Sequence, residues 1–108
     1  MSAPFVTELR SRRQTLHVGP QDGEAITIRV EMPEVWDVVA ISVSPSEPVV
    51  EVKKAALGAL FPEAQRQQDF MFKLKGWEVL NEHDTLGGVG VVNGSILLLT
   101  HRRRRPVR

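Results

Sequence analysis

The sequence predicts an α+β domain in which one helix packs across a mixed sheet of four to five strands. Within the 108 residues only one segment, residues 48–61, has the apolar periodicity of an amphipathic helix, and strand-like alternating segments lie on both sides of it. A single helix of about 14 residues cannot bury its apolar stripe alone, so the strands should form a sheet that covers it. The chain length suits one small core with appendages at its ends.

The helix is the element around which the others are expected to pack. Its apolar stripe consists of residues at helical spacing: Val49, Val52, Ala56 and Leu60, with Ala59 beside them. Its polar residues Glu51, Lys53 and Lys54 are expected to face water. Pro48 suits the first helical position, where an N–H would have no helical partner, and Pro62 ends the helix because it restricts the backbone of the residue before it.

Two strands are predicted before the helix, joined as a hairpin. Residues 25–32 alternate between apolar and polar side chains, which is typical of a half-buried strand. Residues 33–36 (PEVW) turn the chain, and residues 37–43 return it with a second alternating pattern. Residues 14–18 (QTLHV) are a candidate for a short additional strand.

After the helix, alternation predicts a third strand at residues 69–75, and residues 77–80 are a candidate for a further short one. The dipeptide Asn93-Gly94 indicates a tight turn. Residues 95–100 (SILLLT) then form the most apolar strand, which we expect at the centre of the sheet.

The charge of the chain is divided unevenly between the domain and its ends. The net charge is +1, but residues 22–100 hold twelve Asp/Glu and six Lys/Arg, whereas the flanks hold eight Arg and one Glu. We therefore predict a flexible tail at residues 1–21, a domain at residues 22–101 and a basic tail at residues 102–108. The sequence has neither an apolar run long enough for a transmembrane helix nor the apolar region of a signal peptide, and a cytoplasmic location is expected.

The turn into the helix and the strands after it match a known sequence pattern. The segment VSPSE at residues 43–47, followed by VVEVK at residues 49–53, is similar to the corresponding turn and helix of ubiquitin. The later matches are Gln67-Gln68, Phe72-x-Leu74-x-Gly76, Leu80, Thr85-Leu86, Val91 and Ser95-x-Leu97-x-Leu99. Residues 25–101 thus resemble the ubiquitin-like β-grasp family. The resemblance implies that the first strand of the hairpin pairs with both the second and the last strand, with the helix across the concave face.

Two departures from ubiquitin bear on function. Ubiquitin and other conjugated modifiers end in Gly-Gly, whereas here the last strand runs into His101 and a run of arginines. The Gly87-Gly88 pair precedes the last strand, so we interpret it as a backbone turn and not as a processing site. In the apolar patch by which ubiquitin is recognised, Lys73 replaces the central isoleucine and Thr100 replaces a valine, so receptors of the ubiquitin type are not expected to bind.

A ubiquitin-like domain without a diglycine resembles the bacterial YukD-type proteins associated with type VII secretion, and the ubiquitin-like domain of the membrane component EccD. This resemblance implies a non-covalent protein-interaction module, bacterial in character and linked to a secretion system. Two alternatives remain open. One is a modifier precursor whose tail is removed, and the other is a nucleic-acid-associated accessory protein that uses its Arg-rich ends.

No residue pattern indicates an enzyme, a cofactor site or a metal site. The chain has no cysteine, and His17, His83 and His101 lie in separate segments. The adjacent His83-Asp84 pair is interpreted as a hydrogen-bonded turn and not as a catalytic dyad. The segment VGVVNGS lacks the Lys and Ser/Thr of a phosphate-binding loop. We therefore predict a protein without catalytic, cofactor-binding or metal-binding residues.

Two tryptophans at loop positions are the strongest candidates for partner contacts. Trp36 lies in the first hairpin turn, and Trp77 follows the third strand. Large aromatic side chains are enriched among the residues that anchor protein interfaces. The hypothesised partner surface, on one face of the sheet, comprises Trp36, Lys73, Lys75, Trp77 and Thr100. The alternative is that each tryptophan caps the small core.

The end of the chain is strongly basic. The residues predicted to form a functional basic tail are Arg102, Arg103, Arg104 and Arg105. Such a run can engage the phosphates of nucleic acid, an anionic lipid surface or an acidic partner, with steep salt dependence, or it can remain a solvated tail. The edge strand at residues 37–43 can pair with another chain, so a monomer or a weak dimer is expected.

Overall fold

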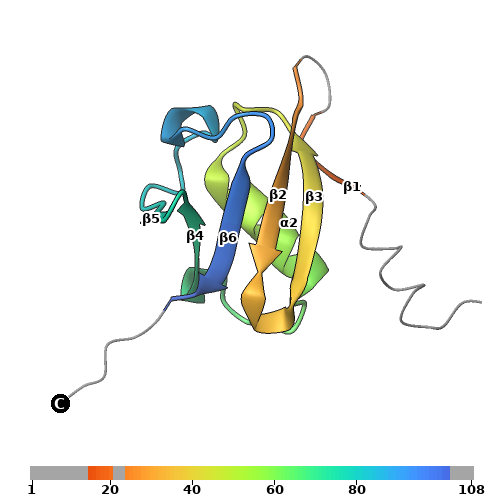
Figure 1. Cartoon of the computed structure of the whole chain (residues 1–108), viewed down its shortest axis with the longest axis vertical. Helices are drawn as coiled ribbons and strands as arrows, with labels where there is room; N and C mark the ends of the chain where they lie inside the picture. Colours follow the sequence, from red (N-terminus) through yellow and green to blue (C-terminus); the bar gives the residue numbers. More distant parts are fainter. Residues whose placement is uncertain (1–14, 21–23, 103–108) are drawn as a thin grey trace, which may run out of the picture.

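In the part of the chain that the structure describes, one α-helix packs across one mixed sheet (Figure 1). The computed structural model describes residues 15–20 and 24–102. Within these residues the sheet has six strands in the order β1-β3-β2-β6-β4-β5. The predicted α+β architecture is confirmed, with one strand more than the largest number expected.

The elements follow the predicted order along the chain. The strands are β1 (Thr15–Val18), β2 (Ile26–Met32), β3 (Asp37–Val43), β4 (Phe70–Leu74), β5 (Trp77–Glu78) and β6 (Ile96–His101). The helix is α2 (Val49–Leu60), and the 3-10 turns are η1 (Pro33–Val35), η2 (Gln67–Asp69) and η3 (Gly87–Val89). The predicted ends of the helix and of β2 to β6 differ from these bounds by two residues at most.

Strand β2 lies between β3 and β6 (Figure 1). It pairs antiparallel with β3 and parallel with β6, and β6 in turn pairs antiparallel with β4. The first strand of the hairpin therefore contacts both the second and the last strand, as the resemblance implied. Strand β6 has a neighbour on each side, which fits its nearly continuous apolar sequence.

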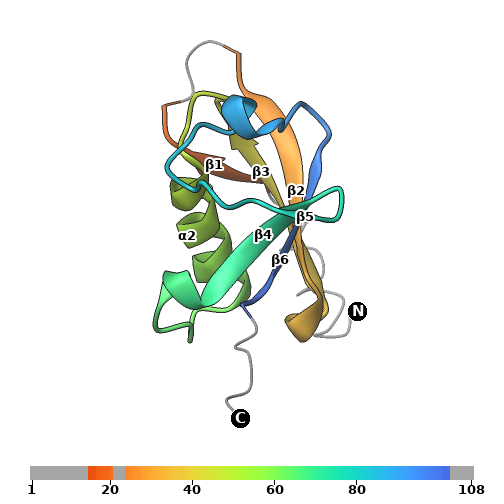
Figure 2. The same cartoon turned by 90° about the vertical axis from the view of Figure 1, so that its left-hand side faces the viewer.

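The core lies between the inner face of the sheet and helix α2 (Figure 2). Strand β2 contributes Ile28 and Val30, and β6 contributes Leu97 and Leu99, because alternate residues of a strand share one face. The buried residues of α2 are Val49, Val52, Lys53, Ala56, Leu57 and Leu60. Among the described residues no element covers the opposite face of the sheet, which we call the open face.

Lys53 does not face water, contrary to the prediction. Its side chain is 0% exposed, and Nζ donates hydrogen bonds to Glu82 Oε1 at 2.6 Å and to the carbonyl oxygen of Phe70 at 2.9 Å. Position 53 follows Val49 by four residues, so it lies inside the core-facing stripe, which is wider than the predicted set of residues. The buried ammonium is tolerated because it has both an ionic and a carbonyl partner.

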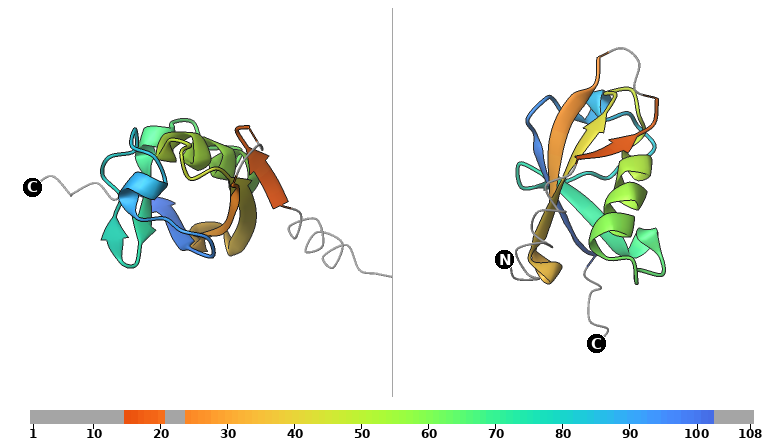
Figure 3. Two further views of the ribbon diagram at one scale, coloured as in Figure 1. Left: turned by 90° about the horizontal axis from the view of Figure 1, so that it is seen from above. Right: turned by 90° about the vertical axis from the view of Figure 1, so that its right-hand side faces the viewer.

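Strand β1 lies before the predicted start of the domain at residue 22. It pairs in parallel with β3 and lies close to α2 (Figure 3). It covers the edge of β3 that we expected to be open. The candidate strand at residues 14–18 is therefore found, whereas residues 1–14 of the predicted flexible tail lie outside the described residues.

Arg102 belongs to the folded domain, although we assigned it to the basic tail. Its backbone N–H donates to the carbonyl oxygen of Asp69 at 2.6 Å, and its Nε donates to the carbonyl oxygen of Gln68 at 3.2 Å. Its guanidinium pairs with Glu78 and lies 3.8 Å from Glu82. The other predicted tail residues, Arg103, Arg104 and Arg105, lie outside the described residues.

The Gly87-Gly88 pair forms a backbone turn, as predicted. The N–H of Gly87 donates to the carbonyl oxygen of Pro45 at 2.8 Å, and the N–H of Gly88 donates to Thr85 Oγ1 at 2.9 Å. A Cβ atom at position 88 would lie 2.5 Å from Asp84 Oδ1, so a larger residue there would displace the Asp84 carboxylate, which accepts from the N–H of Thr85. The turn ties η3 to the segment that leads into α2.

Candidate functional site

The five residues of the hypothesised partner surface lie in two places. Lys73 and Thr100 are on the open face, and Trp36 lies in the β2–β3 turn beside the end of β6. Lys75 and Trp77 lie at the β4–β5 turn, at one edge of the sheet. Trp36 is 93% exposed and Trp77 is 79% exposed, so the alternative that each tryptophan caps the core is wrong.

The open face carries the outward-pointing residues of the four inner strands. Val38, Glu31, Leu98 and Lys73 oppose one another in a row across β3, β2, β6 and β4. Val38 is exposed, and Ile96 on the same face is 48% exposed. Apolar and charged side chains therefore alternate across the open face, and a mixed surface of this kind is compatible with a protein contact.

The turn that carries Trp36 is held by specific hydrogen bonds. Trp36 has a φ of 56°, in the left-handed region, and its N–H donates to the carbonyl oxygen of Pro33 at 3.1 Å. For a bulky residue this conformation costs on the order of 1 kcal/mol. The Glu34 carboxylate joins the turn to β6 by accepting from the hydroxyl of Thr100 at 2.6 Å and from the N–H of His101 at 3.0 Å.

These contacts favour the ionised form of Glu34. Partial burial raises the pKa of a carboxyl group, but the hydrogen bonds from Thr100 and His101 outweigh it and lower the pKa of Glu34 below its ordinary value. Glu34 is therefore ionised at neutral pH. The hydroxyl of Thr100 is already engaged with Glu34, so Thr100 offers a partner its methyl group more readily than its hydroxyl.

The β4–β5 turn determines where Trp77 points. Lys75 and Gly76 both have positive φ, 54° and 86°, which is the geometry of a two-residue type I′ hairpin turn. Trp77 consequently opposes Leu74, and directly opposed residues share one side of a sheet. Leu74 packs against the core, so Trp77 lies on the helix side of the sheet and not on the open face with Lys73.

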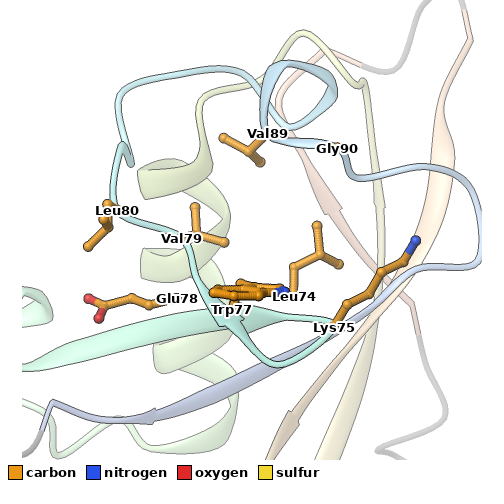
Figure 4. Close-up of a pocket in the computed structure, with 8 residues that line it drawn as sticks. All are labelled: Leu74, Lys75, Trp77, Glu78, Val79, Leu80, Val89 and Gly90. Atoms are coloured by element: carbon orange, nitrogen blue, oxygen red, sulfur yellow. The ribbon is translucent and has the colours of Figure 1, made fainter.

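Trp77 forms one wall of an apolar cleft of about 400 Å³, which we call the Trp77 cleft (Figure 4). Its lining includes Leu74, Lys75, Trp77, Val79, Leu80 and Val89. Leu80 is 80% exposed, although it is as apolar as the buried leucines. The side chains of Trp77 and Leu80 are thus exposed to solvent where they line this apolar cleft.

The charges around this edge of the sheet are unevenly compensated. Glu78 is paired with Arg102, and Glu82 is paired with Lys53. Among the described residues neither Lys73 nor Lys75 has an ion-pair partner. The surface near Lys75 is therefore locally positive on a domain whose overall charge is negative.

Neither a candidate metal site nor a membrane-spanning helix is found in the described part of the chain. There, no three His, Cys, Asp or Glu side chains lie close enough together to hold a metal ion. No helix in the same residues has the length and apolar character to cross a bilayer.

Leu80 and Val89 were not predicted as site residues. Leu80 was assigned to a short strand and Val89 to a glycine-rich loop, and neither belongs to an apolar periodic pattern. They come together because the β4–β5 turn and η3 bring residues distant in sequence to one edge (Figure 4). The one available signal was the apolar triplet Trp77, Val79 and Leu80 in a segment too short for a core strand.

Comparisons with known proteins find similarity in structure only. No protein-family model matches the sequence, and no curated protein matches it. The solved structures that resemble it include the ubiquitin-like domain of an Arabidopsis thaliana protein, with a TM-score of 0.63 and 14% identity, covering 83% of this chain and 90% of that one.

Two further similar structures come from other organisms. The ubiquitin of Caldiarchaeum subterraneum has a TM-score of 0.62 and 17% identity, covering 75% of this chain and 98% of that one. The ubiquitin-like domain of Plasmodium falciparum Dsk2 has a TM-score of 0.61 and 15% identity, covering 72% of this chain and 99% of that one. The fold is thus the ubiquitin-like β-grasp.

Proposed function

We propose that this chain is a non-enzymatic ubiquitin-like module that binds another protein through its open face, with Trp36 as the anchor. The observation that carries the proposal is the state of Trp36, which is 93% exposed on a left-handed backbone that its neighbours hold in place. The open face supplies a surface for the same partner, because it is free of any described element and includes Val38, Ile96 and Lys73.

The energetics favour an interface at this position. An interface tryptophan that becomes fully buried is commonly worth about 2 kcal/mol or more of binding free energy. The turn is already ordered by the contacts of Glu34 and by the hydrogen bond from the N–H of Trp36 to Pro33. Binding therefore does not include the loss of conformational entropy that ordering this turn would cost. A preformed anchor beside a face with exposed apolar side chains, Val38 and Ile96, favours binding of a protein partner.

The finer expectations from the sequence stay predictions. They are the YukD-type branch, the bacterial origin, the link to a secretion system, the cytoplasmic location and the monomeric or weakly dimeric state.

Nucleic-acid binding through the basic tail is not favoured by the one described tail residue, because the guanidinium of Arg102 is engaged by Glu78. Deletion of residues 103–108 discriminates, since it would abolish nucleic-acid binding and leave binding at the open face intact.

The intact mass of the protein recovered from its native host tests the proposal. We expect a protein that carries no covalent link to other proteins and that co-purifies with a non-covalent partner. A shortened chain, or its mass added to lysines of other proteins, would instead identify a processed modifier.

Crosslinking locates the recovered partner. A photo-crosslinker at position 38, on the open face, should react with the partner, whereas one at the exposed Val92 should not.

A further inference from the structure

We propose that the Trp77 cleft is a second contact site, which takes one apolar side chain of the partner flanked by an acidic residue. This inference rests on the proposed function, because it names the partner chemistry of an interaction module. It concerns a different surface, since Trp77 lies on the helix side of the sheet and the anchor Trp36 lies at the β2–β3 turn.

The walls of the cleft are formed before anything binds. The type I′ turn fixes Trp77 opposite Leu74, and the N–H of Val79 donates to the carbonyl oxygen of Phe72 at 2.9 Å. On the opposite wall, the N–H of Val89 is within 3.2 Å of the carbonyl oxygen of Thr85. A preorganised apolar hollow binds a side chain with little loss of its own conformational entropy.

The size and lining of the cleft indicate a side chain and not a cofactor. About 400 Å³ is near the lower end of the range for ligand pockets, and this cleft lacks a convergent set of polar groups. Trp77 and Leu80 are 79% and 80% exposed and both line the cleft, so an inserted aliphatic or phenyl group would cover apolar surface that now faces solvent.

The charge at the rim selects the residue beside that side chain. Lys75 lines the cleft and has no ion-pair partner among the described residues, whereas the carboxylate of Glu78 is already neutralised by Arg102. An incoming carboxylate therefore meets an uncompensated ammonium group, and an incoming ammonium meets no free carboxylate. Complementary charge at a rim mainly determines which partner is accepted.

The test uses the full chain and three blocked tripeptides as probes. The first has phenylalanine between two aspartates, the second has phenylalanine between two lysines, and the third has alanine between two aspartates. Titrations are followed by the NMR shifts of the Trp77 indole N–H and of the Val79 and Val89 amides. We expect the acidic phenylalanine peptide to bind about tenfold more tightly than the lysine peptide, and the alanine peptide to cause no shift.

Two variants make the test specific. Trp77→Ala should abolish binding, and Lys75→Glu should reverse the preference between the acidic and basic peptides; both positions are exposed, so the fold is retained. Trp36→Ala should leave peptide binding unchanged, which separates this site from the anchor. Equal binding of the acidic and basic peptides, a preference that survives Lys75→Glu, or shifts confined to the open face would overturn the proposal while leaving the proposed function standing.

Discussion

The ion pair between Lys53 and Glu82 connects helix α2 to the loop that follows β5. Lys53 Nζ is fully enclosed, and Glu82 also approaches Arg102, so one carboxylate serves two cations from different parts of the chain. Removing the carboxylate leaves the ammonium of Lys53 buried with only the carbonyl oxygen of Phe70. Removing the lysine leaves the carboxylate with Arg102.

This difference predicts unequal effects of the two single substitutions. Glu82→Ala should lower the free energy of unfolding by about 3 kcal/mol, because it leaves an uncompensated buried charge. Lys53→Met should cost less, since the methionine fills the same apolar stripe. Urea denaturation of both variants and of the double variant measures which substitution lowers the free energy of unfolding more. A Lys53→Met protein less stable than Glu82→Ala would show that Lys53 is retained for more than its charge.

Glu34 predicts a pH dependence at the Trp36 turn. Its pKa is lowered in the folded state, so its contribution to stability is present above the unfolded pKa, for which 4.5 is the ordinary value, and is lost as pH falls through the folded pKa. Because Glu34 is largely exposed, we expect less than about 1 kcal/mol. Comparing urea denaturation of the native chain and Glu34→Gln at pH 7 and pH 3 isolates this contribution. An unchanged difference between the two proteins at both pH values would contradict it.

At the scale of elements, the β4–β5 hairpin explains why the hypothesised surface divides. Lys73, Lys75 and Trp77 are spaced by two, which would place them on one face of a continuous strand. The two-residue turn at Lys75-Gly76 instead pairs Lys73 with Glu78 and Leu74 with Trp77, so the alternation is reversed after the turn. The alternating patterns were sufficient to predict each strand, but the pairing across the turn decides the face.

Strand β1, at the edge of the sheet, also depends on tertiary contacts that its own sequence does not reveal. Only Val18 among its four residues is buried, so its local sequence carries little signal, and its stability depends on β3 and α2. By covering β3, it also protects an edge that could otherwise pair with another chain.

A charge at Val18 should therefore detach β1 without unfolding the rest. We expect Val18→Asp to destabilise the fold by about 2 kcal/mol and to speed hydrogen exchange at the β3 amides that point toward β1. Thr15→Asp, at an exposed position of the same strand, is the matched control and should leave exchange unchanged. Uniformly faster exchange throughout β2 and β6 would mean instead that β1 is part of the cooperative core.

For the whole molecule, element order was predictable because β2, β3, α2, β4 and β6 each have a strong local pattern and an amphipathic helix requires a sheet to cover its apolar stripe. The sites were less predictable because they depend on tertiary placement. Lys53 was assigned to solvent from its charge, and Arg102 to the tail from the run that follows it. Both are held in the fold by Glu82 and Glu78, which lie far from them in sequence.

The affinity of the purified native partner for the Trp36→Ala variant measures how much Trp36 contributes to binding. Trp36 is 93% exposed, so its removal does not alter the core, and Val92→Ala at another exposed apolar position is the matched control. We predict that Trp36→Ala weakens binding by about thirtyfold, which corresponds to about 2 kcal/mol, whereas Val92→Ala has no effect. Equal affinities of the native chain and the Trp36→Ala variant, measured by calorimetry on folded proteins, would contradict the assignment of Trp36 as the anchor.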